Sequence, residues 1–142
     1  MGRRISVRVS LVALLATTLA CAALPRGTPA IEGTWVVTRA TLGGKEVPLA
    51  AFQNSALRLA GGQYAFRNDS GEYAVIADAV PSAIDVRGRV GPNAGKTIPA
   101  IFDLRGDTLT ICYDLSGKAR PKDFRSDAGT LLYLARYTRA AP

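Results

Sequence analysis

Apolar and polar side chains alternate along several short stretches of this chain. From Ile84 to Val90, apolar residues and one glycine take the even positions, and Asp and Arg take the odd ones. Residues 109–115, LTICYDL, repeat the pattern with apolar side chains at the odd positions. Because successive side chains of a strand point to opposite faces, each stretch predicts a strand with one face toward a core.

Turn residues separate these stretches at short intervals. Gly61-Gly62 and Arg105-Gly106-Asp107 each join two of them, as in hairpins, and only Pro48–Asn54 suggests a helical turn. About eight strands with turns every 8–12 residues or so predict an all-β antiparallel fold, with a closed up-and-down barrel as first choice and a β-sandwich as second. The expected strands are residues 33–39, 56–59, 64–67, 72–76, 83–90, 97–104, 109–115 and 131–137.

The N-terminal segment has the composition of an export signal. Arg3, Arg4 and Arg8 precede twelve uncharged residues, Val9–Ala20, and small residues follow. Twelve residues of helix span about 18 Å, well short of the ~30 Å apolar core of a bilayer. We therefore predict a signal peptide at residues 1–20, a tether at residues 21–30 and one domain at residues 31–139.

The end of this leader allows two modes of cleavage. Thr18-Leu19-Ala20-Cys21 resembles a bacterial lipobox, although Thr18 stands where a large aliphatic residue is usual. In that case Cys21 is lipidated and anchors an exported protein to a membrane, facing the periplasm or the exterior. Ordinary cleavage after Ala20 or Ala23 gives a soluble secreted or periplasmic protein instead.

Composition excludes several kinds of chemistry. The 142 residues contain no histidine and two cysteines, so the commonest general base, the usual nucleophile–base triads and a four-ligand zinc site are all missing. The formal charge is +7, but without the three leader arginines fifteen basic and eleven acidic residues remain, and the bases are dispersed. We therefore expect no enzyme activity, metal, cofactor or nucleic-acid partner.

Four motifs allow a functional interpretation, but a purely structural explanation fits each of them better. Gly91–Thr97 has the wrong glycine spacing for a phosphate-binding loop and is expected to be a turn. Cys112 has no histidine to activate it and is expected to pack in the core or the barrel wall.

Asp103 and Asp114 would form a glycosidase-like pair only if they met across a hairpin, which makes a carboxylate hydrolase the weakest alternative. Arg120, Phe124 and Arg125 form a cationic loop that could contact an anionic partner, or could simply be solvated.

Several motifs together resemble one family. Glu32-Gly33-Thr34-Trp35 and Gly43-Gly44-Lys45 are followed, in order, by segments over the remaining strands. Across about residues 31–139 the chain resembles an uncharacterised lipocalin-like domain family expanded in planctomycete bacteria. The resemblance implies a lipocalin-like barrel and an export leader, but no activity. The further segments are Gly95-Lys96-Thr97, Gly106-Asp107-Thr108-Leu109, Ile111-Cys112-Tyr113, Arg120-Pro121, Phe124, Ser126 and Gly129.

The resemblance to lipocalins also implies a structural role for the first strand. Gly33-Thr34-Trp35 resembles the Gly-X-Trp segment whose tryptophan closes one end of the lipocalin barrel. An arginine of the last strand covers that tryptophan, and Arg136 and Arg139 are the candidates here. Cation–π stacking provides the attraction, at ~0.5–2 kcal/mol.

These observations predict an exported binding module without catalytic residues. A partly apolar barrel interior would receive one small apolar ligand. The alternative is a filled barrel that works through its surface, in contact with another protein of the cell envelope. The residues expected to line the interior are Val37, Phe66, Phe102, Ile111 and Tyr113.

Overall fold

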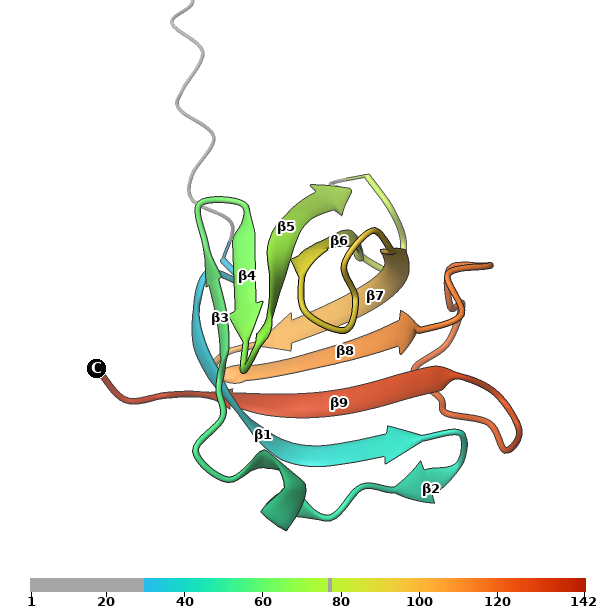
Figure 1. The fold of residues 1–142 in the computed structure, drawn as a ribbon, viewed down its shortest axis with the longest axis horizontal. Coiled ribbons are helices and arrows are strands. Elements are labelled where there is room, and N and C mark those ends of the chain that lie inside the picture. Colours follow the sequence, from blue (N-terminus) through green and yellow to red (C-terminus); the bar gives the residue numbers. More distant parts are fainter. Residues whose placement is uncertain (1–29, 77) are drawn as a thin grey trace, which may run out of the picture.

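A computed structural model describes residues 30–76 and 78–142 of the chain. They form one antiparallel sheet and a short 3-10 helix, η1, close to where the sequence predicted them (Figure 1). The elements in chain order are β1 (Gly33–Leu42), β2 (Lys45–Glu46), η1 (Leu49–Phe52), β3 (Leu57–Ala60), β4 (Gln63–Phe66), β5 (Asp69–Ile76), β6 (Ala83–Val90), β7 (Thr97–Arg105), β8 (Thr108–Asp114) and β9 (Leu132–Arg139).

The sheet closes on itself because β1 pairs along both of its edges. Gly33–Trp35 pair with Leu57–Leu59 of β3, and the length of β1 from Trp35 to Leu42 pairs with β9. The other strands pair with their neighbours in sequence, so eight strands form an up-and-down barrel, and β2 adds a short hairpin to β1. Closure leaves few unpaired strand edges. The predicted lipocalin-like barrel is confirmed, and the sandwich is excluded.

The inward-facing residues of the strands form the core. On β8, Leu109 and Ile111 lie on the same face, as the alternation predicted, and the structure buries that face inside the barrel. Trp35 of β1 and Tyr137 of β9 join them in the same cluster. Burial of these apolar side chains is the main favourable contribution to folding, at roughly 25 cal/mol per Å².

A second buried layer lies outside the barrel, under the long segment between β8 and β9. Ile101 and Cys112 are register partners on the outward faces of β7 and β8, yet they are 1% and 0% exposed. The Sγ of Cys112 donates a hydrogen bond of 3.3 Å to the carbonyl oxygen of Arg125. Residues 115–131 therefore cover this part of the outer wall instead of extending freely into solvent.

Candidate functional site

A cavity of about 380 Å³ opens inside the barrel. Its volume lies at the lower end of the range found for small-molecule pockets. Every strand except β2 contributes side chains to its wall, as does η1, and most of these side chains are apolar. The apolar wall consists of Leu42, Val47, Ala51, Phe52, Leu57, Leu59, Phe66, Ile84, Val86, Ile98, Ile111 and Leu115.

Of the five residues expected to line the interior, three line this cavity. They are Phe66, Ile111 and Tyr113. Val37 and Phe102 also belong to the interior, but they pack into the core beyond the cavity. The cavity reaches only Leu42 on β1 and Ile98 on β7, so the other two positions lie further along their strands, where side chains fill the barrel.

Four tyrosines bring hydroxyl groups to the cavity wall. The Oη atoms of Tyr113 and Tyr137 lie 3.3 Å apart, and the ring of Tyr133 stacks on that of Tyr113 at 5.7 Å between centroids. Burial raises the pKa of Tyr113 and of Tyr137 well above the usual 10. Burial also raises the pKa of Tyr133, to about 12, although the charge of Arg67 lowers it in part. These groups are therefore neutral at physiological pH and can donate or accept hydrogen bonds.

The fourth tyrosine belongs to a polar corner of the cavity. Asp69 accepts hydrogen bonds from the Tyr64 hydroxyl at 3.3 Å and from the Asn93 amide nitrogen at 2.7 Å. Burial and then the Asp69 charge raise the pKa of Tyr64 to about 12. Gly91–Thr97 is a turn, as expected, and it folds back on β6, where Gly95 donates to the Gly88 carbonyl. This return brings Asn93 to the cavity.

Arg67 lies at the rim of the cavity, in the turn between β4 and β5. Its guanidinium carbon is 5.8 Å from the centre of the Phe52 ring and 5.5 Å from that of Phe66. Its Nε donates a hydrogen bond of 2.8 Å to the Ser55 hydroxyl. The guanidinium thus joins the segment after η1 to the β4–β5 turn.

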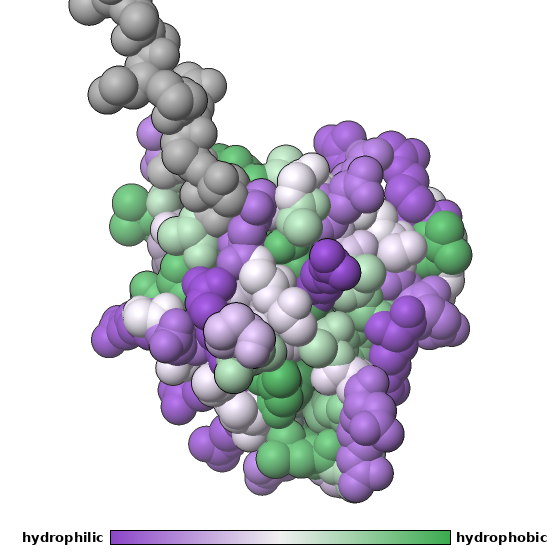
Figure 2. All heavy atoms as spheres, turned by 90° about the vertical axis from the view of Figure 1, so that its left-hand side faces the viewer, coloured by the Kyte–Doolittle hydropathy of each residue, from purple (hydrophilic) through white to green (hydrophobic). Residues whose placement is uncertain are grey.

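Exposed apolar side chains also occur on the side of the barrel that carries η1. In Figure 2 they gather in the lower part of the view, at the height where Figure 1 places η1 and β2. Leu49 of η1 is 52% exposed. Because Phe52 of the same short helix lines the cavity, η1 presents apolar surface both to the cavity and to solvent.

Trp35 and Arg139 meet at the opposite end of the interior. Trp35 is fully buried, its Nε1 donates to the Ile31 carbonyl at 2.8 Å, and the Arg139 guanidinium lies 4.2 Å from its ring centre. Arg139 also donates to the carbonyls of Glu32 and Ala30. A Cβ on Gly33 would lie 2.5 Å from Nη1 of Arg139, and Gly33 has φ 142°, so this position favours glycine.

Arg136, the other candidate for covering the tryptophan, lies elsewhere. It is exposed, and it alternates with the buried Ala135 and Tyr137 along β9. Its side chain therefore points out of the barrel. Of the two arginines named from the sequence, only Arg139 contacts the Trp35 ring.

The two arginines of the cationic loop, Arg120 and Arg125, contact the barrel wall and nearby carboxylates, respectively. Arg120 donates to the carbonyls of Ile84 and Ala100 and forms an ion pair of 2.6 Å with Asp85. Phe124 is half-buried. The Arg125 guanidinium lies 3.8 Å from carboxylate oxygens of both Asp123 and Asp127. Arg120 thus ties residues 115–131 to the barrel wall through both of its Nη atoms.

The two carboxylates considered for hydrolysis are not across from each other. Asp103 is the register partner of Thr110 and forms an ion pair with Arg105. Asp114 is buried and accepts hydrogen bonds from Ser116, Lys118 and Ala119. The conditional pair therefore does not form in this fold, because the β7–β8 register places Asp103 opposite Thr110, four residues before Asp114. Cys112 is also buried, and this burial raises the pKa of its thiol.

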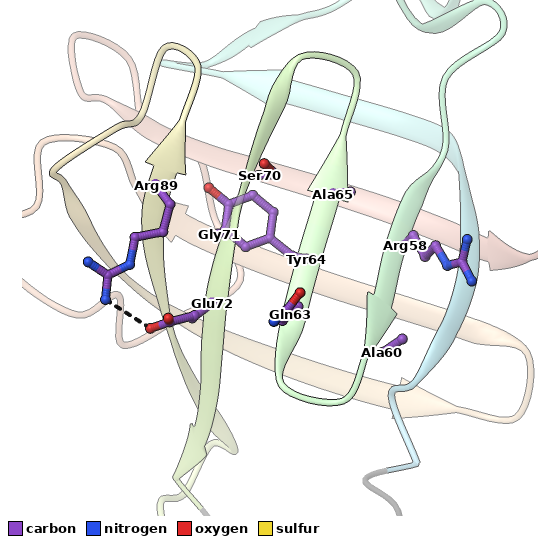
Figure 3. Close-up of a pocket in the computed structure, with 9 residues that line it drawn as sticks. All are labelled: Arg58, Ala60, Gln63, Tyr64, Ala65, Ser70, Gly71, Glu72 and Arg89. Atoms are coloured by element: carbon purple, nitrogen blue, oxygen red, sulfur yellow. Dashed lines mark hydrogen bonds and ion pairs between the residues drawn. The ribbon is translucent and has the colours of Figure 1, made fainter.

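A second hollow, of about 350 Å³, lies on the outer face of β3–β6 (Figure 3). Small side chains such as Ala60, Ala65 and Ser70 leave it shallow between longer polar neighbours. Two of the charges beside it, Arg89 and Glu72, are paired with each other at 3.1 Å, and both side chains are more than half exposed. Because it is open to solvent and its lining is largely polar, it is a weaker candidate site for an apolar ligand than the interior cavity.

No protein-family model, curated protein or solved structure matches this chain. Within residues 30–76 and 78–142, no three His, Cys, Asp or Glu side chains gather closely enough to hold a metal ion. The same residues include no helix with the length and apolarity needed to cross a membrane. Cys21 and the predicted leader lie outside the described residues.

Sequence reasoning missed the polar part of the cavity. For Tyr133 and Tyr137 a signal was present, because with Ala135 they occupy alternate positions of the last strand. Arg67, Asp69 and Asn93 lie in turns or at the start of a strand, where alternation carries no information. Only the path of the chain in space brings those three side chains to one cavity.

Proposed function

We propose that this protein is a non-enzymatic binding module whose barrel holds one small, mainly apolar molecule. The observation that carries the proposal is the cavity of about 380 Å³. A fully packed barrel would leave no room for a ligand, whereas this wall offers apolar contacts from almost every strand. Transfer of an apolar molecule from water into such a cavity is favourable, since it removes apolar surface from water on both partners.

The tyrosine hydroxyls add selectivity to this apolar site. Tyr113 and Tyr137 share one hydrogen bond between their hydroxyls, so lone pairs and a proton remain for a ligand. A ligand with one or two polar groups could bond to them without burying a charge. The proposed ligand is therefore apolar along most of its surface and fits a cavity of modest size.

Filling the cavity with a larger side chain tests this function. Val86 of β6 lines the cavity, and we expect Val86→Trp to weaken binding of the neutral fluorescent probe N-phenyl-1-naphthylamine at least tenfold, about 1.4 kcal/mol. The indole would occupy the space that the probe needs. The measurement is a fluorescence titration with the purified barrel.

The matched control is Val90→Trp on the same strand. Val90 is 61% exposed and does not line the cavity, so probe affinity should stay within about twofold of the original. Near-ultraviolet circular dichroism checks that both variants fold. A barrel that binds no probe, or a Val86→Trp variant that binds it as tightly as before, would contradict the proposal and favour action through the barrel surface on an envelope protein.

We propose further that the chain is exported and anchored through a lipid on Cys21. The support is the basic and apolar leader followed by a lipobox-like segment. Protein isolated from its host's membranes should have an intact mass that begins at Cys21 and includes a diacylglyceryl group. A soluble product beginning at Cys21 or Leu24 without any acyl group would refute the anchor and leave ordinary export.

A further inference from the structure

Arg67 is held at the cavity rim by contacts from two separate segments. Phe52 lies at the end of η1 and Phe66 at the end of β4, and the guanidinium is within cation–π distance of both rings. The Ser55 hydroxyl accepts from Nε alone. These contacts fix the plane of the guanidinium and leave the edge that carries its two Nη atoms.

That edge has no protein partner in the described part of the chain. Neither Nη of Arg67 donates a hydrogen bond there, and no carboxylate lies within ion-pair distance of the guanidinium. Arg120 and Arg139 differ, since both use Nη atoms on backbone carbonyls. Arg67 is therefore a positioned cation whose strongest donors are free.

The backbone conformation of Arg67 is a second indication that its side chain has a function. Phe66 and Asp69 are register partners, so Arg67 and Asn68 form a two-residue turn, and Arg67 has φ 57°. That left-handed conformation favours glycine and is strained for an arginine. Strained residues that persist at the edge of a cavity commonly serve a function there.

We infer that the ligand of the cavity is an amphipathic anion, whose apolar body fills the barrel and whose terminal oxyanion, a carboxylate or a phosphate monoester, binds the two Nη atoms of Arg67. This inference rests on the function proposed above. The guanidinium fork matches both oxyanions, which accept two parallel hydrogen bonds from it. Asp69 also lines the cavity, but its carboxylate is occupied by Tyr64 and Asn93. Its negative charge places the anionic end at Arg67 rather than at that corner.

Three ligands with the same alkyl chain test the inference. Decanol, decanoate and decyl phosphate are titrated at pH 8 by displacement of the neutral probe from the full barrel, decanol below its solubility limit and the two anions below their micelle concentrations. In the original protein, at least one anion should bind roughly tenfold more tightly than decanol, about 1.4 kcal/mol. The two anions distinguish a carboxylate from a phosphate ligand. Added salt should reduce the difference, because Arg67 is exposed on its outer side.

Arg67→Gly removes the guanidinium and relieves the left-handed backbone at the same time. In this variant the ratio of anion to decanol affinity should fall to about one, while the neutral probe still reports a folded, open cavity. Arg58→Met is the matched control, because Arg58 lies on the outer face of β3 and its loss changes the net charge equally. In that variant the tenfold ratio should persist.

The outcomes separate the two proposals. If decanol and the probe bind but neither anion binds more tightly than decanol, the anion inference is wrong and the apolar site stands. An anion preference that survives Arg67→Gly, or disappears equally in Arg58→Met, also overturns the role of Arg67. If neither decanol nor the probe binds the original protein, the proposed function itself fails.

Discussion

Trp35→Ala is expected to lower the free energy of unfolding by about 3–5 kcal/mol, as for other large-to-small changes at fully buried aromatic residues. Trp35 is completely buried in the barrel core, its indole N–H bonds to Ile31, and Arg139 covers its ring. Alanine would leave a cavity and would remove the surface on which Arg139 rests. Equilibrium unfolding in urea measures the effect.

The neighbouring residue provides the control for this prediction. Val36 is on the outward face of β1 and 44% exposed, so Val36→Ala should cost less than about 1 kcal/mol. Arg139→Met should have an intermediate effect, because it removes the cation–π contact and the hydrogen bonds to Glu32 and Ala30. A loss below about 1.5 kcal/mol for Trp35→Ala would mean that Trp35 does not close the barrel.

Asp114→Ala is expected to destabilise the fold by about 2–3 kcal/mol at neutral pH. The Asp114 carboxylate is buried at the end of β8 and accepts hydrogen bonds from the backbone nitrogens of Ser116, Lys118 and Ala119, and from the Ser116 hydroxyl. Alanine would leave these donors unpaired where residues 115–131 begin to cover the outer wall. Asp123→Ala is the control in the same segment, since Asp123 is exposed and makes only one long ion pair with Arg125. It should cost less than about 0.5 kcal/mol.

The effect of Asp114→Ala should depend on pH. Burial raises the pKa of Asp114, but the hydrogen bonds from Ser116, Ala119 and Lys118 outweigh burial and hold the pKa below the usual 3.8. A carboxyl group with a lowered pKa in the folded state stabilises the fold fully above its unfolded pKa, and this contribution is lost as the pH falls through the folded value. The difference between the original protein and Asp114→Ala should therefore shrink as the pH falls from neutral to below the unfolded pKa of 3.8. A constant difference over that range, in urea unfolding at each pH, would contradict this role of the carboxylate.

The alternation of apolar and polar residues predicted most strands because burial of one face imposes a period of two. It predicted their ends less well. β1 continues from Arg39 to Leu42, since β9 pairs with it through Tyr133, and β5 begins at Asp69 because the turn after β4 is only two residues long. The two-residue β2 is too short for an alternating pattern to predict it, and it is a strand only because it pairs with the end of β1. Strand ends depend on the partner strand, which local sequence does not describe.

The amino-acid sequence by itself determined the all-β class, the number of barrel strands and the fact that Leu109 and Ile111 share one face of a strand, because these follow from local alternation and turn residues. The tertiary structure alone decided the register that separates Asp103 from Asp114, and the depth at which side chains stop filling the barrel. It also brought Asn93, from the segment between β6 and β7, to the same cavity as Arg67 and Asp69 at the β4–β5 turn. The physical reason is that a pattern along the chain reports which side chains share a face of a strand, whereas a binding site depends on distances between residues that are far apart in sequence.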